Sequence, residues 1–423
     1  MNKILILMLI CLVASGLTGC GTFSVSADAV SVADATATAQ AAQPATPVAA
    51  ENTPVPEIGE VETGTVTPEP EPAAALPAPL YYLNPDDNQV WRVEPDGVTL
   101  TQISQEVGPV EQYDVNPVDG SLVLLSNNNL ILTNALGGER RVIAGGRSEE
   151  EAGVHWYLTD RITNPVWSED GQQLAYGLNG INFYEVASGT SRVVLPNDQM
   201  PEDEAQARRP ILLYTPNSFS PDGTFLLLTA GWYQAGGGGP AVLRLNTAAP
   251  LVELQGEGFP CCTFRWTRDG SAILSANHTF GMFQPGLWRS DAATGETETL
   301  IAGDAGGDEV RLFNWPQDLG NGQIAVFYGE GPRATHEQGL PAVMSLATVD
   351  AQAGTIIEQW AGEWIPGEAT WLPDGSGVAL TDTAGQTGQV WPPAGTLTYL
   401  SLAGEEVELP ARAHRLRWGV VSQ

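Results

Sequence analysis

Histidine is the commonest metal ligand among protein side chains, and three of the four histidines in this chain lie in or just before long predicted loops. Loops that brought His155, His278 and His336 together could hold a metal ion. However, HEQGL at His336 supplies only one histidine, so it lacks the H-E-x-x-H spacing of zinc proteases. The chain also has no Gly-x-Ser-x-Gly nucleophile motif. The sequence therefore predicts no metal, cofactor or catalytic residue, although paired carboxylates drawn from different repeats remain an open alternative.

The same loops carry many aromatic side chains, which suit protein interfaces and stacking on sugars alike. A rigid scaffold that holds such loops commonly uses them for binding. The candidate binding face comprises His155, Trp156, Tyr157, Trp232, Tyr233, His278, Phe280, Phe283, His336 and Trp391. The alternative is that these side chains fold back over their own strands.

Cysteine supplies a second kind of candidate chemistry, because Cys261 and Cys262 are adjacent. Adjacent thiols lack the spacing of a zinc site. A disulfide between neighbours would be strained and easily reduced. Three interpretations stay open: two unlinked thiols on a strand, a vicinal disulfide that stiffens a turn, or a metal or redox function.

The N-terminus reads MNKILILMLICLVASGLTGC, with a positive residue, an apolar run from Ile4 to Val13, and a small residue before Cys20. The apolar run is too short to span a bilayer as a mature helix. This stretch resembles a bacterial lipoprotein signal peptide with its lipobox. The resemblance implies that residues 1–19 are removed, that Cys20 is lipid-modified, and that the protein is extracytoplasmic and anchored to a bacterial membrane, facing the periplasm or the cell surface.

Residues 20–79 are rich in Ala, Thr, Pro, Val and Glu and have almost no aromatic residues. Such a segment buries too little apolar surface to offset its ordering entropy, so we expect a disordered tether. Residues 80–423 are long enough for a large core.

The net charge of the chain is −32 and Lys3 is its only lysine, which argues against binding of nucleic acid. We expect a monomer.

A short phrase recurs along residues 80–423, and it combines an aromatic residue, Asp-Gly and an alternating apolar run. It reads WSEDGQQLAY from Trp167, FSPDGTFLLL from Phe219, WTRDGSAIL from Trp266 and WLPDGSGVAL from Trp371. With departures, the aromatic position recurs at Asp114, Trp167, Phe219, Trp266, Trp315, Trp371 and Trp418. A period of about 50 residues is typical of propellers. Asp-Gly followed by alternation predicts a tight hairpin whose glycine has positive φ.

Each repeat holds four predicted strands, which describes one propeller blade. In the repeat from Asn164 these are NPVWS, QQLAYG, INFYEV and SRVVL. The first repeat has only three strands, and HRLRWGVV near the C-terminus would complete it. We therefore predict an all-β, seven-bladed propeller of antiparallel blades, with six or eight blades as alternatives. The phrase resembles the TolB-like (PD40, WD40-like) repeats, which implies a platform for protein interactions in the bacterial envelope.

Short turns are expected at one end of the blades and long connections at the other. The long connections are residues 145–161, 196–216, 231–240, 279–285, 329–341 and 384–393. We expect a non-catalytic module that docks an envelope or surface protein through the long connections. The alternatives are recognition of a glycan or cell-wall fragment, an enzyme acting on sugars, and a purely structural or sensory role.

Overall fold

The computed structural model describes residues 75–152, 156–199, 211–233, 237–245, 247, 251–255, 263–277, 284–304, 306–336, 342–384 and 394–420. All of them belong to one compact unit, Glu69–Gln423. The predicted signal peptide and Cys20 lie outside the described residues, as do Cys261 and Cys262.

Strands dominate the described chain and fall into groups of four. The first group has β1 (Leu80–Leu83), β2 (Val90–Val93) and β3 (Leu100–Gln102), followed by β4 (Val110–Val115), β5 (Leu122–Ser126), β6 (Asn129–Thr133) and β7 (Arg141–Gly145). Next come β8 (Thr163–Trp167), β9 (Gln173–Gly177), β10 (Gly180–Glu185) and β11 (Thr190–Pro196), then β12 (Ile211–Phe219), β13 (Phe225–Tyr233), β14 (Gly237–Arg244) and β15 (Val252–Glu253). The chain continues with β16 (Thr263–Trp266), β17 (Ala272–Asn277), β18 (Gly286–Asp291) and β19 (Thr297–Ala302), then β20 (Glu309–Gly320), β21 (Gln323–Pro332), β22 (Ser345–Asp350) and β23 (Thr355–Gln359). The last strands are β24 (Pro366–Trp371), β25 (Gly377–Asp382), β26 (Gly395–Ser401) and β27 (Glu406–Trp418).

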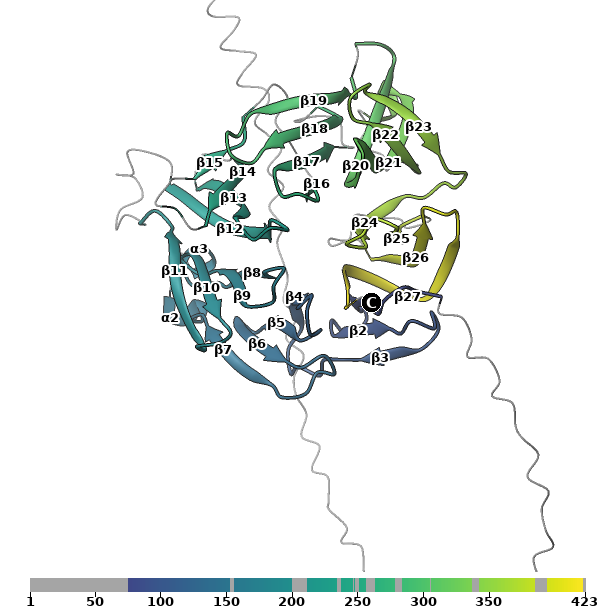
Figure 1. Ribbon diagram of the computed structural model, residues 1–423. Helices are drawn as coiled ribbons and strands as arrows, with labels where there is room; N and C mark the ends of the chain where they lie inside the picture. The colour runs from purple at the N-terminus through teal and green to yellow at the C-terminus, as the bar shows by residue number, and fades with distance from the viewer. Residues whose placement is uncertain are drawn as a thin grey trace, which may run out of the picture. The chain divides into compact units, whose positions relative to one another are not determined.

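These strands form five four-stranded sheets and one seven-stranded sheet, all antiparallel, in the order β24-β25-β26-β27-β1-β2-β3 for the largest. The sheets form a ring, with β4, β16 and β24 on its inner side and β3, β11, β19 and β23 on its outer side (Figure 1). The fold is therefore a β-propeller, and the core lies within the sheets and between neighbouring ones.

The seven-stranded sheet is two blades joined by one strand. The first part of β27 pairs with β26, as in Gly395↔Ala413, and its last part pairs with β1, as in Leu80↔Trp418. Splitting β27 between the two gives seven blades of four strands, as the sequence predicts, numbered here from the blade of β1–β3. The final strand closes the ring, which leaves no open gap between the chain's first and last blades.

The repeated aromatic residues pack between neighbouring blades at the ends of the innermost strands, as expected. Trp266 of β16 stacks on Phe225 of blade 4 at 6.2 Å, and its Nε1 donates to Ser218 Oγ at 3.1 Å. Trp371 Nε1 likewise donates to the Trp315 carbonyl of the preceding blade at 2.8 Å. Trp266 and Trp371 therefore each join their own blade to the blade before it.

The assignment of Asp114 to the aromatic position is wrong by one residue. The amide of Asn116 donates to the Ser121 carbonyl, in the way that Ser168 donates to Gln173 in the next blade. This equivalence puts buried Val115 at the aromatic position and Asp114 at the position before it. The turn of this blade also carries one residue more between Val115 and Asp119 than the next blade carries between Trp167 and Asp170.

The Asp-Gly pairs make the tight turns that the sequence predicts. Ser168 Oγ donates to Asp170 Oδ1 at 2.6 Å, and Asp170 also accepts from the amide of Gln172. Gly171 has φ 66°, and a Cβ there would lie 2.5 Å from Asn116 Oδ1 of the preceding turn. Only glycine fits such a place without strain.

Two regions depart from the expected organisation. The Gly-rich segment 231–240 is mostly strand rather than loop, because β13 and β14 stay paired as far as Trp232↔Gly237. Leu76, placed in the tether by composition, is buried, and its amide donates to the Pro95 carbonyl. The described residues also include three short helices, α2 (Glu149–Ala152), α3 (Trp156–Thr159) and α4 (Arg333–His336). No helix in the described ranges has the length and apolar character needed to cross a membrane.

Candidate functional site

The two ends of the blades define two faces. The short-turn face carries the turns from first to second and from third to fourth strand, including the Asp-Gly turns. The long-loop face carries the other connections. Of the predicted binding residues, His155, His278, Phe280, Phe283 and Trp391 lie outside the described residues. Tyr157, Tyr233 and His336 are described as backbone in α3, β13 and α4. Trp156 and Trp232 are described in full.

Trp156 organises its own connection, 145–161, on the long-loop face. Its Nε1 donates to the Arg147 carbonyl at 2.6 Å, and the Arg161 guanidinium lies 6.0 Å above its ring. Arg147 forms a two-pronged ion pair with Asp160, at 2.6 and 2.9 Å. Asn128 Nδ2 completes the arrangement by donating to the Arg147 and Asp160 carbonyls. Trp156 therefore agrees in part with the alternative that these aromatic side chains fold back: its side chain packs on its own loop and does not point freely to solvent.

Trp232 behaves differently, because it lies near the long-loop end of β13 and is 47% exposed. Its neighbour across the sheet is Leu212 of β12, and on the other side it pairs with Gly237, which has no side chain to cover it. It is the only exposed tryptophan in the described part of the chain. A large, rigid, uncovered aromatic side chain on a firmly paired hairpin is a suitable anchor for a partner.

A second firmly held segment of the long-loop face surrounds α4. The Arg333 guanidinium makes a two-pronged ion pair with Asp304, in the connection from β19 to β20, and Arg333 Nε donates to the Gly307 carbonyl. The hydrogen bonds from Arg333 lower the pKa of Asp304 to about 2. Two neighbouring connections are thereby tied together on this face, close to the backbone position of His336.

The axis of the ring is lined by polar side chains from the innermost strands. Each innermost strand, including the last part of β27, has a neighbouring strand on one side only, so the N–H groups on its other side need acceptors. Asp114 Oδ2 accepts from the Trp167 amide at 2.8 Å, and Glu368 Oε1 accepts from the Leu416 amide at 3.0 Å. These axial carboxylates bond to the next blade, and burial raises the pKa of each. They are therefore parts of the ring rather than free bases.

Arg265 and Glu169 carry opposite charges near the axis but form no direct ion pair. Arg265 Nε donates to Gln317 Oε1 at 3.0 Å, and within the described residues its guanidinium makes no ion pair. Burial lowers its pKa, and Glu169 is the opposite charge that interacts with it. Glu169 is exposed to solvent yet surrounded by protein, so burial raises its pKa while Arg265 opposes that rise. These residues could contact a ligand at the axis, but the described residues contain no cluster of three or more metal-ligating side chains.

The sequence analysis overlooked the axial residues, although a signal was present. Arg265 and Arg417 immediately precede Trp266 and Trp418, and Asp114 precedes Val115 in the same way. Because side chains alternate between the two faces of a sheet, the residue before an aromatic that packs on the preceding blade points toward the next blade. A charge at that position of an innermost strand therefore marks a group that bonds to the next blade, as Arg265 does with Gln317.

Comparisons with known proteins agree with the fold. No protein-family model and no curated protein matches the chain. Among solved structures, TolB from Acinetobacter baumannii is 16% identical, over 78% of this chain and 79% of that one, with a TM-score of 0.40. A functionally unknown protein from Desulfotomaculum acetoxidans DSM 771 is 10% identical, over 82% and 100%, with a TM-score of 0.49. The dihydro-heme d1 dehydrogenase NirN is 14% identical, over 84% and 77%, with a TM-score of 0.48. These likenesses concern the fold alone: the chain is a β-propeller, with a structural match to TolB-like and other propellers.

Proposed function

We propose that the protein is a non-catalytic binding module that docks an envelope or surface protein through its long-loop face. The observation that carries the proposal is Trp232, which is 47% exposed at the end of the β13–β14 hairpin. Tryptophan is enriched among the residues that dominate the energy of protein interfaces. The backbone pairing of the hairpin limits the entropy that docking would cost.

The position of the N-terminal segment supports this choice of face. Leu76 contacts Pro95 in the turn between β2 and β3, so the chain joins the first blade at the short-turn face. A lipid on Cys20 would therefore be connected to the end of the ring opposite Trp232. In this proposal the protein is a lipid-anchored, extracytoplasmic propeller whose long-loop face is free to meet a partner.

Two further observations support binding over the alternatives. The axial carboxylates Asp114 and Glu368 are engaged by backbone amides of the next blade, which leaves them poorly suited to acid–base chemistry. A sugar-stacking site would need several free ring faces, whereas Arg161 lies over the ring of Trp156. Protein docking needs only the exposed anchor and its surroundings.

Photo-crosslinking in intact cells tests the proposal, with a photoreactive amino acid in place of Trp232. The matched control carries the same probe in place of Val98, which is 69% exposed in a turn of the short-turn face. We expect one protein adduct at Trp232 and none of that mass at Val98. Docking through this face would be contradicted by a protein adduct at Val98 alone, by a glycan rather than a protein crosslinked at Trp232, or by no adduct at either position.

A further inference from the structure

At some seams of the ring, a glycine lets two neighbouring blades approach closely at the outer side. There, the turn between the third and fourth strands of one blade lies against the end of the preceding blade's outer strand. A Cβ at Gly137 would lie 1.8 Å from the carbonyl oxygen of Ile103, and one at Gly295 would lie 2.3 Å from that of Glu253. Both glycines have φ 77°. The backbones approach so closely only because glycine has no side chain.

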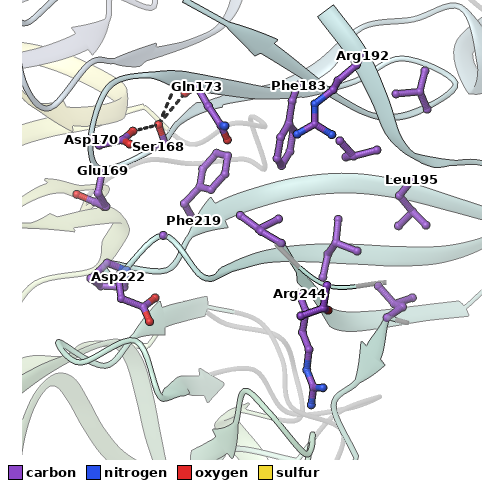
Figure 2. Close-up of a pocket in the computed structure, with 18 residues that line it drawn as sticks. Ser168, Glu169, Asp170, Gln173, Phe183, Arg192, Leu195, Phe219, Asp222 and Arg244 are labelled. Carbon is purple, nitrogen blue, oxygen red and sulfur yellow. Dashed lines mark hydrogen bonds between the residues drawn. The ribbon is translucent and has the colours of Figure 1, made fainter. Parts of the chain in front are cut away.

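Not every seam has such a contact: a Cβ at Gly189 of blade 3 would meet only Tyr184 Oη of its own blade, and one at Gly404 of blade 7 would meet nothing within 4 Å. At the seam between blades 3 and 4, the corresponding connection reads LNTAAPL from Leu245 to Leu251 and has no glycine in its sequence. A groove of about 810 Å³ lies at this seam, between β11 of blade 3 and the end of β14 in blade 4 (Figure 2). We call it the seam groove. Its volume is within the range of sites that bind small molecules and peptide side chains.

The middle of the seam groove is apolar. Phe183 and Phe219 form its floor, with ring centroids 5.5 Å apart. Val194 and Leu195 of β11 and Leu243 of β14 line it and are only partly buried. A ligand with aliphatic side chains could cover this remaining apolar surface, with a gain of about 25 cal/mol for each Å² buried.

One end of the seam groove is acidic. Glu169, Asp170 and Asp222 lie together at the end formed by the Asp-Gly turns, whereas Arg192 lies beside the apolar middle (Figure 2). The Arg244 guanidinium donates to the Ala293 carbonyl of blade 5. The Arg192 guanidinium lies 5.4 Å over the Phe183 ring, and its side chain is 59% exposed. The groove therefore favours a ligand with a cationic group at the acidic end and aliphatic groups beside it.

The outer wall of the groove is an edge strand. β11 is the last strand of its sheet, and Val193 is 56% exposed. An edge strand offers unpaired backbone groups to which an extended peptide can add. A peptide strand along β11 would place alternate side chains in the groove.

We propose that the seam groove binds an extended peptide segment of a partner protein, with aliphatic side chains over Val194 and Leu243 and a basic side chain beside Glu169 and Asp222. The protein's own tether does not fit this description, because residues 20–74 contain no lysine or arginine. The basic group must therefore come from another molecule. This site lies apart from Trp232 and is independent of docking on the long-loop face.

Selection of displayed random dodecapeptides on the full chain tests the proposal, with counter-selection on the Val193→Lys variant. A lysine on the edge strand removes apolar contact and repels a basic peptide. The matched control is Val142→Lys, because Val142 occupies β7, the outer strand of blade 2, and is 49% exposed. We expect enriched sequences that combine a basic residue with alternating aliphatic residues, bound by the Val142→Lys variant but not by the Val193→Lys variant.

Fluorescence anisotropy with the most enriched peptide then locates the basic end. Glu169→Gln should weaken binding about tenfold, which corresponds to about 1.4 kcal/mol, whereas Glu298→Gln on β19 should leave it unchanged. Trp232→Ala should also leave it unchanged, which separates this site from the long-loop face. In the selection, the proposal is overturned by enriched sequences that are acidic or share no pattern, or by peptides that bind both lysine variants equally. In the anisotropy measurement, it is overturned by unaltered affinity for Glu169→Gln or by loss of binding to Trp232→Ala.

Discussion

Arg417 and Asp114 are 303 positions apart in the chain, yet Nε of Arg417 donates to Oδ1 of Asp114 at 3.0 Å. Arg417 lies in the part of β27 that belongs to blade 1, and Asp114 lies in the first strand of blade 2. The other oxygen of Asp114 accepts from the amide of Trp167 in blade 3. One carboxylate thus links three consecutive blades, including the one that contains both ends of the propeller.

Replacement of Asp114 by alanine should therefore weaken the closed ring. The Arg417 guanidinium and the Trp167 amide would both lose an acceptor, so we expect a loss of about 1–3 kcal/mol in the free energy of unfolding. Urea denaturation measures it. The exposed pair Arg161–Glu111, at 2.9 Å, provides the control, and Glu111→Ala should cost less than about 1 kcal/mol. Equal losses in the two variants would contradict a special role for Asp114.

Replacement by phenylalanine should change the free energy of unfolding by different amounts at two buried tryptophans in equivalent positions. Trp371 Nε1 donates to the Trp315 carbonyl at 2.8 Å, whereas Trp167 Nε1 has no hydrogen-bond partner within the described residues. Both side chains are buried, so the packing cost should be similar. We expect Trp371→Phe to destabilise the protein by about 1 kcal/mol more than Trp167→Phe, as measured by urea denaturation. A larger loss in Trp167→Phe would disprove this explanation.

Two turn glycines separate backbone strain from steric overlap. Gly171 and Gly223 have φ of 66° and 68°, but a Cβ meets Asn116 Oδ1 at 2.5 Å in the first and nothing within 4 Å in the second. Asn116 cannot move freely, since its Nδ2 donates to the Gly171 carbonyl. Gly223→Ala should lower the free energy of unfolding by about 1–2 kcal/mol, because alanine disfavours the left-handed conformation. Gly171→Ala should lower it further, because its Cβ also overlaps Asn116. Thermal unfolding compares them, and equal shifts would show that the overlap is relieved without cost.

His414 should make the protein less stable in mild acid. It lies in β27 where the strand changes partner, and burial followed by repulsion from Arg415 lowers its pKa to about 4. The unfolded chain, with a pKa of about 6.5, binds a proton that the native state excludes between these values. The contribution is therefore complete above pH about 6.5 and declines as the pH falls toward about 4.

The measurement is urea denaturation at neutral pH and at pH about 5, for the natural protein and for His414→Leu. At the lower pH the histidine should account for a loss of about 2 kcal/mol, which the leucine variant should not show. Identical pH dependence in the two proteins would mean that His414 does not titrate in this way.

The fold was predictable because its signals are local. The aromatic residue, the Asp-Gly turn and the alternation around Trp266 all lie within one short stretch, and their period predicts the blades. Counting strands at the two ends predicted that a C-terminal strand completes the first blade. The sequence did not show that this strand is continuous with the fourth strand of the last blade in β27. The segment 231–240 was harder, because its glycines are typical of a loop, whereas the backbone of Trp232 pairs with that of Gly237.

The sites were less predictable because they depend on distant contacts. Nothing near Asp114 in the sequence points to Arg417, whose guanidinium donates to it from 303 positions away. The seam groove is lined by side chains from two blades, such as Phe183 and Phe219, and no local signal in the sequence brings these together. Trp156 and Trp232 look alike in the sequence, and only the contacts around them separate a loop anchor from an exposed side chain.

The most direct test of the docking face is hydrogen exchange of the full chain, measured alone and in the complex captured at Trp232. Protection should appear in the β13–β14 hairpin and in connection 145–161, and the turns at Pro95–Thr99 and Asn134–Gly138 should exchange as in the free protein. Protection confined to those short turns, with the hairpin unchanged, would contradict docking through the long-loop face.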